Sequence, residues 1–336
     1  MMERKHKNIP IFVPHIGCPN DCSFCNQKKI TGVKDKISIQ KAEEIINEAL
    51  KTVDENSDVQ IAFFGGSFTG IEKDYRIELL DLANKYLKAK KVSGIRLSTR
   101  PDYIDEEILD ELKEYGVTDI ELGVQSLDED VLIKNRRGHT KEDTIKAAKL
   151  IKEKNFRLGL QMMPGLFGDT KEKTLYTANE IIKLAPYCVR IYPTVVIKDT
   201  YLAELYEKGE FKPLSIDDAV KVTAELYEKF TENNIKVIRM GLMASGDLAD
   251  GSEVLAGPFH PSFGELCMSE ILFNKAKKQI EGKKGDAKVY VNPKTVSAFV
   301  GNKKKNIKRL EEILGAKVAV HQDEKLERNE VRVVVS

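Results

Sequence analysis

The chain has no long hydrophobic run, and this absence argues against a helical membrane protein. Its longest apolar stretches, such as residues 191–197, are short, whereas a membrane-spanning helix takes about 20 consecutive apolar residues. Residues 1–8 are polar and basic, without the apolar centre of a secretory signal. No internal repeat or low-complexity tract stands out. We therefore expect a soluble cytoplasmic protein.

Cysteine is also scarce, and its placement argues against a disulfide framework. There are 5 cysteines in 336 residues, and three of them, Cys18, Cys22 and Cys25, fall close together. Disulfide-stapled folds are mostly short secreted chains with an even number of cysteines. The 41% hydrophobic content is enough for the core of one large domain or two ordinary ones without such staples. A reducing compartment and a metal site explain the pattern better.

The chain also lacks a large excess of positive or negative charge, since its formal net charge is +1. One segment departs from this balance, because residues 271–317 carry 13 lysines or arginines against 4 acids. Such a segment can face a polyanion. It can equally be a solubilising surface, and composition leaves both interpretations open.

Short runs rich in β-branched residues alternate with helical patterns along most of the chain. Segments such as 38–53 and 105–114 place apolar residues at helical spacing between the expected strands. This alternation predicts an α/β fold with a parallel sheet. Right-handed crossovers turn six such units into a partial (β/α)6 barrel, shorter than the closed barrel of eight. The predicted strands are residues 9–15, 59–64, 94–99, 117–124, 157–163 and 189–196.

The end of the chain changes character and is predicted to form a small appended α+β domain. A long helix at about 216–233, a strand at 236–240 and a basic helix at 265–280 come first. The last segment then has the order strand, helix, turn, helix, strand, strand. We place the boundary near Gly282, which divides the chain into residues 1–281 and a small basic domain of residues 282–336.

The three clustered cysteines form a CxxxCxxC motif directly after the first predicted strand. Three thiolates on one loop can hold three irons of a [4Fe–4S] cluster, and because such clusters usually take four cysteines, one iron stays open. Cys18, Cys22 and Cys25 are therefore candidate ligands of a cluster that binds S-adenosylmethionine (SAM) at its open corner. Two other interpretations stay open on spacing alone. One is a zinc site completed by His15 or a distant cysteine, and the other is a loop of free thiols.

With Phe24 directly before Cys25, the loop resembles the CxxxCxΦC motif of the radical SAM superfamily, where Φ is aromatic. That superfamily uses one electron from the cluster to cleave SAM into an adenosyl radical. Its second strand ends in a glycine-rich turn that binds the methionine amino group, and FFGGSFTG at 63–70 looks like this turn. Glycine lets backbone carbonyls approach an ammonium group without a Cβ in the way. The resemblance implies SAM contacts at Gly65, Gly66 and Ser67.

Later motifs are similar to the branch that contains the catalytic subunit of Elongator, and in part to oxygen-independent coproporphyrinogen oxidase. They are RPD at 100–102, ELGVQS at 121–126 and NRRGHT at 135–140. The resemblance implies that Gln125 contacts the adenosyl ribose and Arg137 the methionine carboxylate, which suits an arginine fork. Alternatively, Arg137 pairs with a local acid such as Asp130 on a solvent face.

The chain departs from these relatives at two expected SAM contacts. Ser98 stands where relatives commonly place an acid for the ribose hydroxyls, and Gln161 stands where they often have Asp or His. Both side chains can still form hydrogen bonds. Phe12 lies where relatives place an aromatic residue near the adenosine.

Two further segments extend the resemblance to about residues 9–275. Residues 189–197 look like the sixth strand of the Elongator branch, and residues 257–266 resemble the C-terminal radical SAM extension of related, mostly uncharacterised bacterial proteins. The Elongator subunit modifies the wobble uridine of transfer RNA (tRNA) and also carries an acetyltransferase domain. We expect no room for such a domain here, so the resemblance does not imply the full carboxymethyl-type reaction.

The last segment gives an independent indication of an RNA partner. Its order of elements, with GNKKKNI at 301–307 in the turn, resembles a KH RNA-binding module, where a GxxG loop clamps backbone phosphates. Lys304 replaces the second glycine, although lysines can contact phosphates as point charges. The candidate RNA contacts are Lys303, Lys304 and Lys305. A structural or dimerisation role for this segment is the alternative.

These observations lead to one main hypothesis of function and two alternatives. The main hypothesis is a radical SAM enzyme, with a [4Fe–4S] cluster and SAM as cofactors, that modifies tRNA as a transferase or oxidoreductase. Its electron donor would be a protein such as a flavodoxin or ferredoxin. The first alternative acts on a small molecule such as a porphyrinogen, and the second is a non-catalytic metal-bearing RNA-binding protein. Cys188, Cys267 and His260 are expected to be structural.

Overall fold

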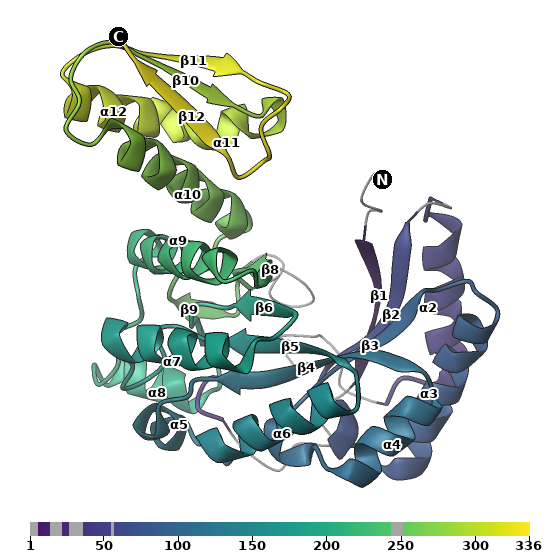
Figure 1. Cartoon of the computed structure of the whole chain (residues 1–336). Coiled ribbons are helices and arrows are strands. Elements are labelled where there is room, and N and C mark those ends of the chain that lie inside the picture. Colours follow the sequence, from purple (N-terminus) through teal and green to yellow (C-terminus); the bar gives the residue numbers. More distant parts are fainter. Residues whose placement is uncertain (1–5, 14–21, 27–35, 55–56, 243–250) are drawn as a thin grey trace.

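The computed structural model describes residues 6–13, 22–26, 36–54, 57–242 and 251–336. Its main feature is a 7-stranded sheet in the order β1-β2-β3-β4-β5-β6-β8, in which neighbouring strands are parallel. The sheet curves into an open arc with β1 and β8 at its edges (Figure 1). The predicted partial barrel is confirmed, and the strand predicted at 236–240 joins it. The strands are β1 (His6–Val13), β2 (Asp58–Gly65), β3 (Gly94–Thr99), β4 (Val117–Gln125), β5 (Arg157–Met162), β6 (Cys188–Ile191) and β8 (Lys236–Met240).

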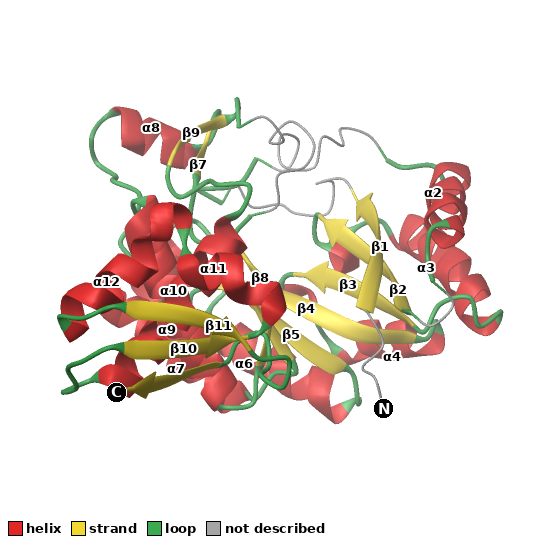
Figure 2. Ribbon diagram, turned by 90° about the horizontal axis from the view of Figure 1, so that it is seen from above, coloured by secondary structure: helices red, strands yellow, loops and turns green. Residues whose placement is uncertain are grey.

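Helices cover the outer face of this arc (Figure 2). Several begin at a side-chain cap, since Asp105, Thr140 and Thr170 each accept a hydrogen bond from the backbone N–H three residues later. Such caps satisfy N–H groups that a helix start leaves unpaired. Among the described residues, no helix is long and apolar enough to cross a membrane. The outer helices are α2 (Ile39–Lys51), α3 (Lys73–Lys88), α4 (Glu106–Glu114), α6 (Lys141–Glu153), α7 (Lys171–Leu184) and α9 (Ile216–Glu232).

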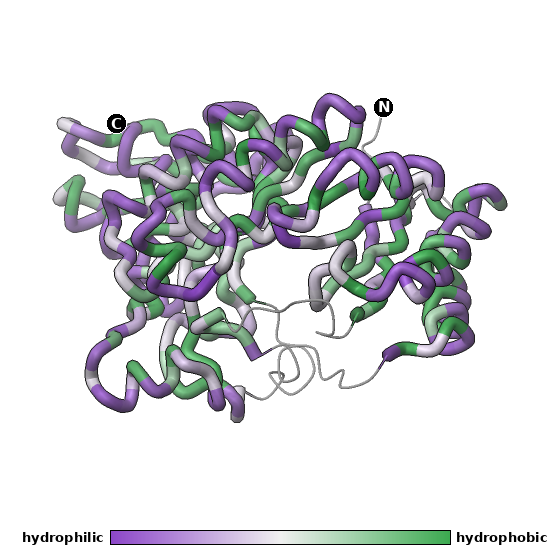
Figure 3. Tube along the Cα trace, turned by 90° about the horizontal axis from the view of Figure 1, so that it is seen from below, coloured by the Kyte–Doolittle hydropathy of each residue, from purple (hydrophilic) through white to green (hydrophobic). Residues whose placement is uncertain are grey.

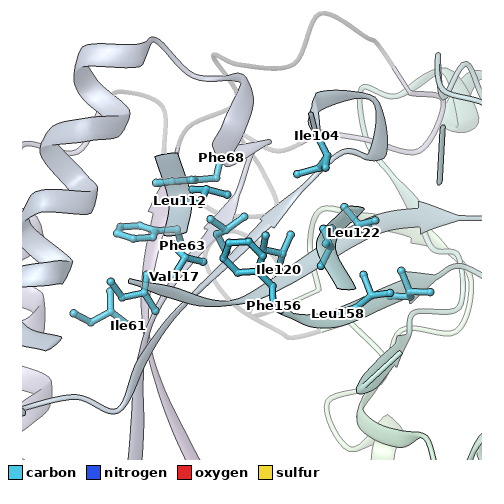
Figure 4. Packing of buried hydrophobic residues seen from close by; sticks show 14 of the residues in the cluster. Ile61, Phe63, Phe68, Ile104, Leu112, Val117, Ile120, Leu122, Phe156 and Leu158 are labelled. Atoms are coloured by element: carbon cyan, nitrogen blue, oxygen red, sulfur yellow. The ribbon is translucent and has the colours of Figure 1, made fainter. Parts of the chain in front are cut away.

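The main hydrophobic core lies between the sheet and these helices (Figure 4). Alternate residues of β4, such as Ile120 and Leu122, are fully buried in it. Phe63 of β2 stacks on Phe68, with ring centroids 4.6 Å apart. Hydrophobic and hydrophilic residues alternate along the outer helices (Figure 3), as expected for helices with one face on a sheet. Because successive strand residues point to opposite faces, the residues between the core positions face the hollow of the arc.

Short elements follow the carboxyl ends of several strands. α5 (Glu129–Lys134) comes after β4. β7 (Val196–Ile197) pairs antiparallel with β9 (Val254–Ala256), and α8 (Tyr201–Glu207) follows β7. β7, β9 and α8 lie side by side at one end of the arc (Figure 2).

The C-terminal part forms a smaller layer of helices and strands, which confirms the predicted appended α+β domain. Its sheet has the order β11-β10-β12, with β11 parallel and β12 antiparallel to β10. α10 (Phe263–Ile280) links it to the barrel (Figure 1): Phe263 and Cys267 pack near α9, whereas Leu272 and Ile280 belong to the core of the small domain. The boundary near Gly282 stays a prediction. The other elements are β10 (Ala287–Val291), α11 (Val296–Val300), α12 (Lys305–Leu314), β11 (Val318–Gln322) and β12 (Val331–Val335).

Candidate cofactor and active site

The described part of the predicted cluster loop is fixed by two neighbouring elements. Cys22 is buried, Cys25 is half-buried, and neither forms a disulfide. The backbone N–H of Ser23 donates to the carbonyl of Asn135 at 3.0 Å, and its hydroxyl donates to the Asn135 side-chain oxygen at 2.6 Å. Its carbonyl accepts from the N–H of Leu202 at 2.7 Å. The end of α5 and the start of α8 therefore hold the segment that carries both thiols.

A cavity of about 870 Å³ runs along the hollow face of the arc, and both cysteines line it. This volume lies in the upper part of the usual range for ligand pockets, roughly 300–1,000 Å³. Cys18, the third predicted ligand, lies outside the described residues, and these contain no group of three potential metal ligands. The structure brings to this one cavity all the residues predicted to contact SAM, although their individual roles stay predictions: Phe12, Gly65, Gly66, Ser67, Ser98, Gln125, Arg137 and Gln161.

The glycine-rich turn lies against the end of the first strand. Gly65 has a φ of 103°, in a region that residues with a Cβ rarely adopt. The N–H of Gly66 donates to the carbonyl of Val13 at 3.0 Å. Val13 is the last residue of β1, so this bond holds the turn at the end of that strand. The turn lines the same cavity as Cys22 and Cys25.

The two glutamines meet at the ends of β4 and β5. Gln125 follows a bulge in β4 and has a φ of 67°. The side-chain amide of Gln161 donates to the side-chain oxygen of Gln125 at 3.2 Å. A left-handed backbone at a residue other than glycine costs roughly 1–3 kcal/mol and is often found at ligand sites. This conformation supports the predicted contact of Gln125 with a ligand in the cavity.

Arg137 is buried in the cavity wall. One of its terminal nitrogens donates to the Sγ of Cys22 at 3.1 Å. The alternative of a solvent-facing pair with Asp130 is wrong, because Asp130 is bound by Lys134 at 3.0 Å and Lys173 at 2.7 Å. The structure therefore sets the guanidinium beside a predicted cluster ligand, where a carboxylate can also reach it.

Charged side chains that the sequence analysis did not assign line the hollow face. Glu121 accepts hydrogen bonds from Arg96, at 2.6 Å, and from Arg190. Asp119 accepts from Arg96 at 2.9 Å and from Arg157 at 2.7 Å. Burial raises the pKa of Glu121, but Arg190 and Arg96 outweigh this and leave the pKa below its ordinary value. Glu121 is therefore ionised at neutral pH and holds two arginines in place.

One sequence signal could have revealed these residues. A parallel sheet buried on both faces has strands of nearly continuous apolar residues. On β4, by contrast, Asp119 and Glu121 alternate with the core residues Ile120 and Leu122. Charged residues at every second position of a central strand predict that the inner face of the barrel is polar, rather than packed with apolar side chains.

The remaining thiols and one histidine are structural, as expected. Burial raises the pKa of Cys188 to about 11 and that of Cys267 to about 12, so both stay neutral thiols. The Nδ1 of His260 accepts a hydrogen bond from the N–H of Ser262 at 3.0 Å and stabilises a turn. None of the three lines the cavity.

The sequence profile of the radical SAM superfamily matches residues 12–181, and that of the radical SAM C-terminal domain matches residues 186–272. The chain belongs to the radical SAM superfamily. It is therefore an enzyme, and its cofactors are a [4Fe–4S] cluster and SAM. This membership decides against the zinc site, the free thiols and the non-catalytic protein.

Curated relatives in this superfamily include proteins named for tRNA. The tRNA uridine(34) acetyltransferase of Methanocaldococcus infernus is 33% identical over 196 residues, which are 52% of this chain and 37% of that protein. Elongator complex protein 3 of Homo sapiens is 32% identical over 202 residues, 53% of this chain and 37% of that protein. An uncharacterized protein of Methanocaldococcus jannaschii is 32% identical over 222 residues, 65% of each chain. The chain thus covers little more than a third of the first two relatives.

Among solved structures, the archaeal Methanocaldococcus infernus Elp3 with an N-terminal deletion has a similar fold. Its TM-score is 0.65 at 24% identity, and the match covers 84% of this chain and 66% of that one. At this identity the likeness shows the fold alone. It supports the radical SAM partial barrel described above.

The residues of the cavity fit the cofactors of the superfamily. Cys22 and Cys25 lie on one anchored segment and form no disulfide. The backbone at Gly65 can approach a ligand closely because no Cβ is in the way. These cysteines would hold the cluster, while the turn and Gln125 would hold SAM. When bound, the cluster supplies the electron that breaks the sulfonium bond of SAM and releases an adenosyl radical.

Replacing Arg137 with alanine is expected to weaken SAM binding without loss of iron. A charge-assisted hydrogen bond to the methionine carboxylate contributes about 1.5–3 kcal/mol to binding. The iron should be retained because the variant keeps the predicted cysteine ligands. Calorimetry on the reconstituted enzyme measures the affinity. Arg136→Ala is the matched control, because Arg136 is exposed and stacks on Tyr201, 3.5 Å from the ring centroid. Equal SAM affinity in both variants would contradict the assignment.

Proposed function

We propose that this radical SAM enzyme modifies a nucleotide of tRNA. The observation that carries the proposal is the 33% identity, over 196 residues, to a protein named tRNA uridine(34) acetyltransferase. The chain covers 37% of that protein, so acetyl transfer is not part of the proposal. Reaction on a base requires it to leave its stack and enter a pocket, and the cavity lined by the cysteines offers that space.

The conformation of the lysine loop between α11 and α12 supports an RNA partner. Gly301 has a φ of 72°, Lys303 a φ of 49° and Lys304 a φ of 60°. Lys304 occupies the position of the second glycine of a GxxG loop and has a left-handed backbone, a conformation that glycine adopts readily. A left-handed conformation costs an L-residue roughly 1–2 kcal/mol, and such cost tends to be retained where a segment has a function.

The loop is anchored at Asn306, and its three lysines are exposed. The side-chain amide of Asn306 donates to the carbonyl of Phe299 at 3.0 Å and to the hydroxyl of Ser269 at 2.9 Å. Lys305 lies 3.5 Å from the carboxylate of Asp217 on α9. Lys303 and Lys304 are exposed, which suits contacts with backbone phosphates. Because its ammonium group already pairs with Asp217, Lys305 is the weakest of the three candidate phosphate contacts.

The reaction also needs an electron source and an RNA-containing compartment. A flavodoxin or ferredoxin would supply electrons to the cluster, one at a time. Both proteins and tRNA occur in the cytoplasm, where we propose that the enzyme acts. A reducing compartment also keeps the cluster thiols available as ligands.

The proposal predicts that one modified nucleoside is missing from the tRNA of a strain that lacks the gene. Total tRNA is digested to nucleosides and compared by mass spectrometry with that of the parent strain. The wild-type gene should restore the nucleoside, and a Cys22→Ala gene should not, because it lacks a cluster ligand. Identical nucleosides in both strains would reject tRNA as the substrate and make a small molecule such as a porphyrinogen the leading hypothesis.

A further inference from the structure

The cavity wall formed by β6 and β8 carries more positive charge than its described acids balance. Arg190 of β6 and Arg239 of β8 are register partners, and both line the cavity. Arg190 is bound to Glu121, but Glu121 already accepts from Arg96. The wall therefore has a surplus of cations that a bound anion would neutralise.

Arg239 is the member of this wall with an open guanidinium. It is half-buried, and its Nε donates to the carbonyl of Gly241 at 3.3 Å. Within the described ranges, no carboxylate lies within salt-bridge distance of it. A planar guanidinium with open terminal nitrogens matches the oxygens of a phosphate group.

The position of Arg239 relates it to the predicted SAM contacts. Gly123, Gln161, Arg190 and Arg239 are consecutive register partners across β4, β5, β6 and β8. Neighbouring strands are about 4.8 Å apart, so the backbone of Arg239 lies roughly 10 Å from that of Gln161. A ligand that reaches from one to the other lies across the hollow face, between the SAM contacts and the edge of the sheet.

Aromatic side chains border the same region. The hydroxyl of Tyr192 lies 3.2 Å from a terminal nitrogen of Arg190, and the Arg190 guanidinium lies 5.1 Å from the ring centroid of Phe64. Tyr192 and Phe64 both line the cavity. Flat aromatic surfaces favour stacking with a nucleobase. The wall thus combines a group that recognises an anion with groups that recognise a base.

We propose that Arg239, beside the fixed Arg190, binds a phosphate of the substrate nucleotide in this cavity. The base then lies between the aromatic rings and the SAM contacts. This inference rests on the proposed function and adds the group of the substrate that is recognised and the residue that recognises it. Neither the cluster motif nor the lysine loop contributes to this contact.

The inference predicts that a nucleotide binds better than the matching nucleoside. Uridine 5′-monophosphate and uridine are titrated calorimetrically into the reconstituted enzyme with SAM present and no reductant. The monophosphate should bind about tenfold or more tightly, as for one charge-assisted hydrogen-bonded contact. Arg239→Gln should remove this advantage and Arg239→Lys should keep part of it. Arg332→Gln, which changes an exposed arginine on β12, should leave it intact.

Two results would overturn the inference. One is a phosphate advantage that survives Arg239→Gln, and the other is equal binding of monophosphate and nucleoside to the wild type. Succinate should not displace the monophosphate. Displacement by succinate would also overturn the inference, because the site would then accept carboxylates in general. If the Arg239-dependent advantage is found but tRNA nucleosides do not change on gene deletion, the phosphate site stands and the tRNA proposal fails.

Discussion

Replacing Cys22 with alanine should remove most of the iron and abolish formation of 5′-deoxyadenosine. Cys22 is buried in the cavity wall next to Arg137, and a cluster held by three thiolates loses a ligand without it. Ser23 keeps its bonds to Asn135 and Leu202, so the fold around the loop should persist. Iron and sulfide are measured after anaerobic reconstitution, and the nucleoside is measured by chromatography after addition of SAM and dithionite.

Cys188→Ala and Cys267→Ala are the matched controls for this experiment. Both thiols are buried among other elements and do not line the cavity, so both variants should retain iron and SAM cleavage. Thermal melts show whether all variants are folded. Cleavage at the wild-type rate by Cys22→Ala would refute the cluster assignment, and equal iron loss in a control would show that the effect comes from the fold.

Replacing Lys303, Lys304 and Lys305 together with glutamate should abolish tRNA binding. Reversal of charge at an exposed loop turns attraction to phosphates into repulsion. Each lost phosphate contact should also reduce the slope of log affinity against log salt by about 0.7 for a single strand. SAM cleavage without substrate should survive, because the cysteines lie in the barrel. Binding of labelled tRNA at several salt concentrations measures both effects.

The matched control reverses the same number of charges on the outer face of the barrel. Lys146, Lys149 and Lys152 are exposed on α6, and their replacement with glutamate should leave most of the tRNA affinity. If both triple variants lose affinity equally, the effect is one of net charge and the loop has no special role. Unchanged affinity and slope in the loop variant would assign its lysines to an ordinary solvated surface.

Features encoded within short segments were predictable from the sequence. The cysteine spacing, the turn at Gly65 and the alternation of strands and helices each depend on neighbours in the chain. For this reason the partial barrel and the family were predicted correctly. The strand at 236–240 was also predicted, but its place in the sheet depends on pairing with β6, which local pattern does not determine.

Features that depend on contacts between residues far apart in the chain were not predictable in the same way. Glu121 meets Arg190 across 69 positions of the chain, and Arg137 meets Cys22 across 115. The fold brings these residues together, and no residue in either motif specifies its partner. The Asp130 alternative for Arg137 failed for this reason, because sequence proximity suggested a pair that the fold separates.

α10 fixes the spacing between the cavity and the lysine loop. This helix of 18 residues, about 27 Å long, packs near α9 at its start and in the small domain at its end. The lysine loop is tied to the same helix through Asn306 and Ser269. A change in the distance from loop to cavity would have to break this packing. If the lysine loop binds RNA as proposed, only nucleotides at a fixed distance from the bound segment would reach the cavity.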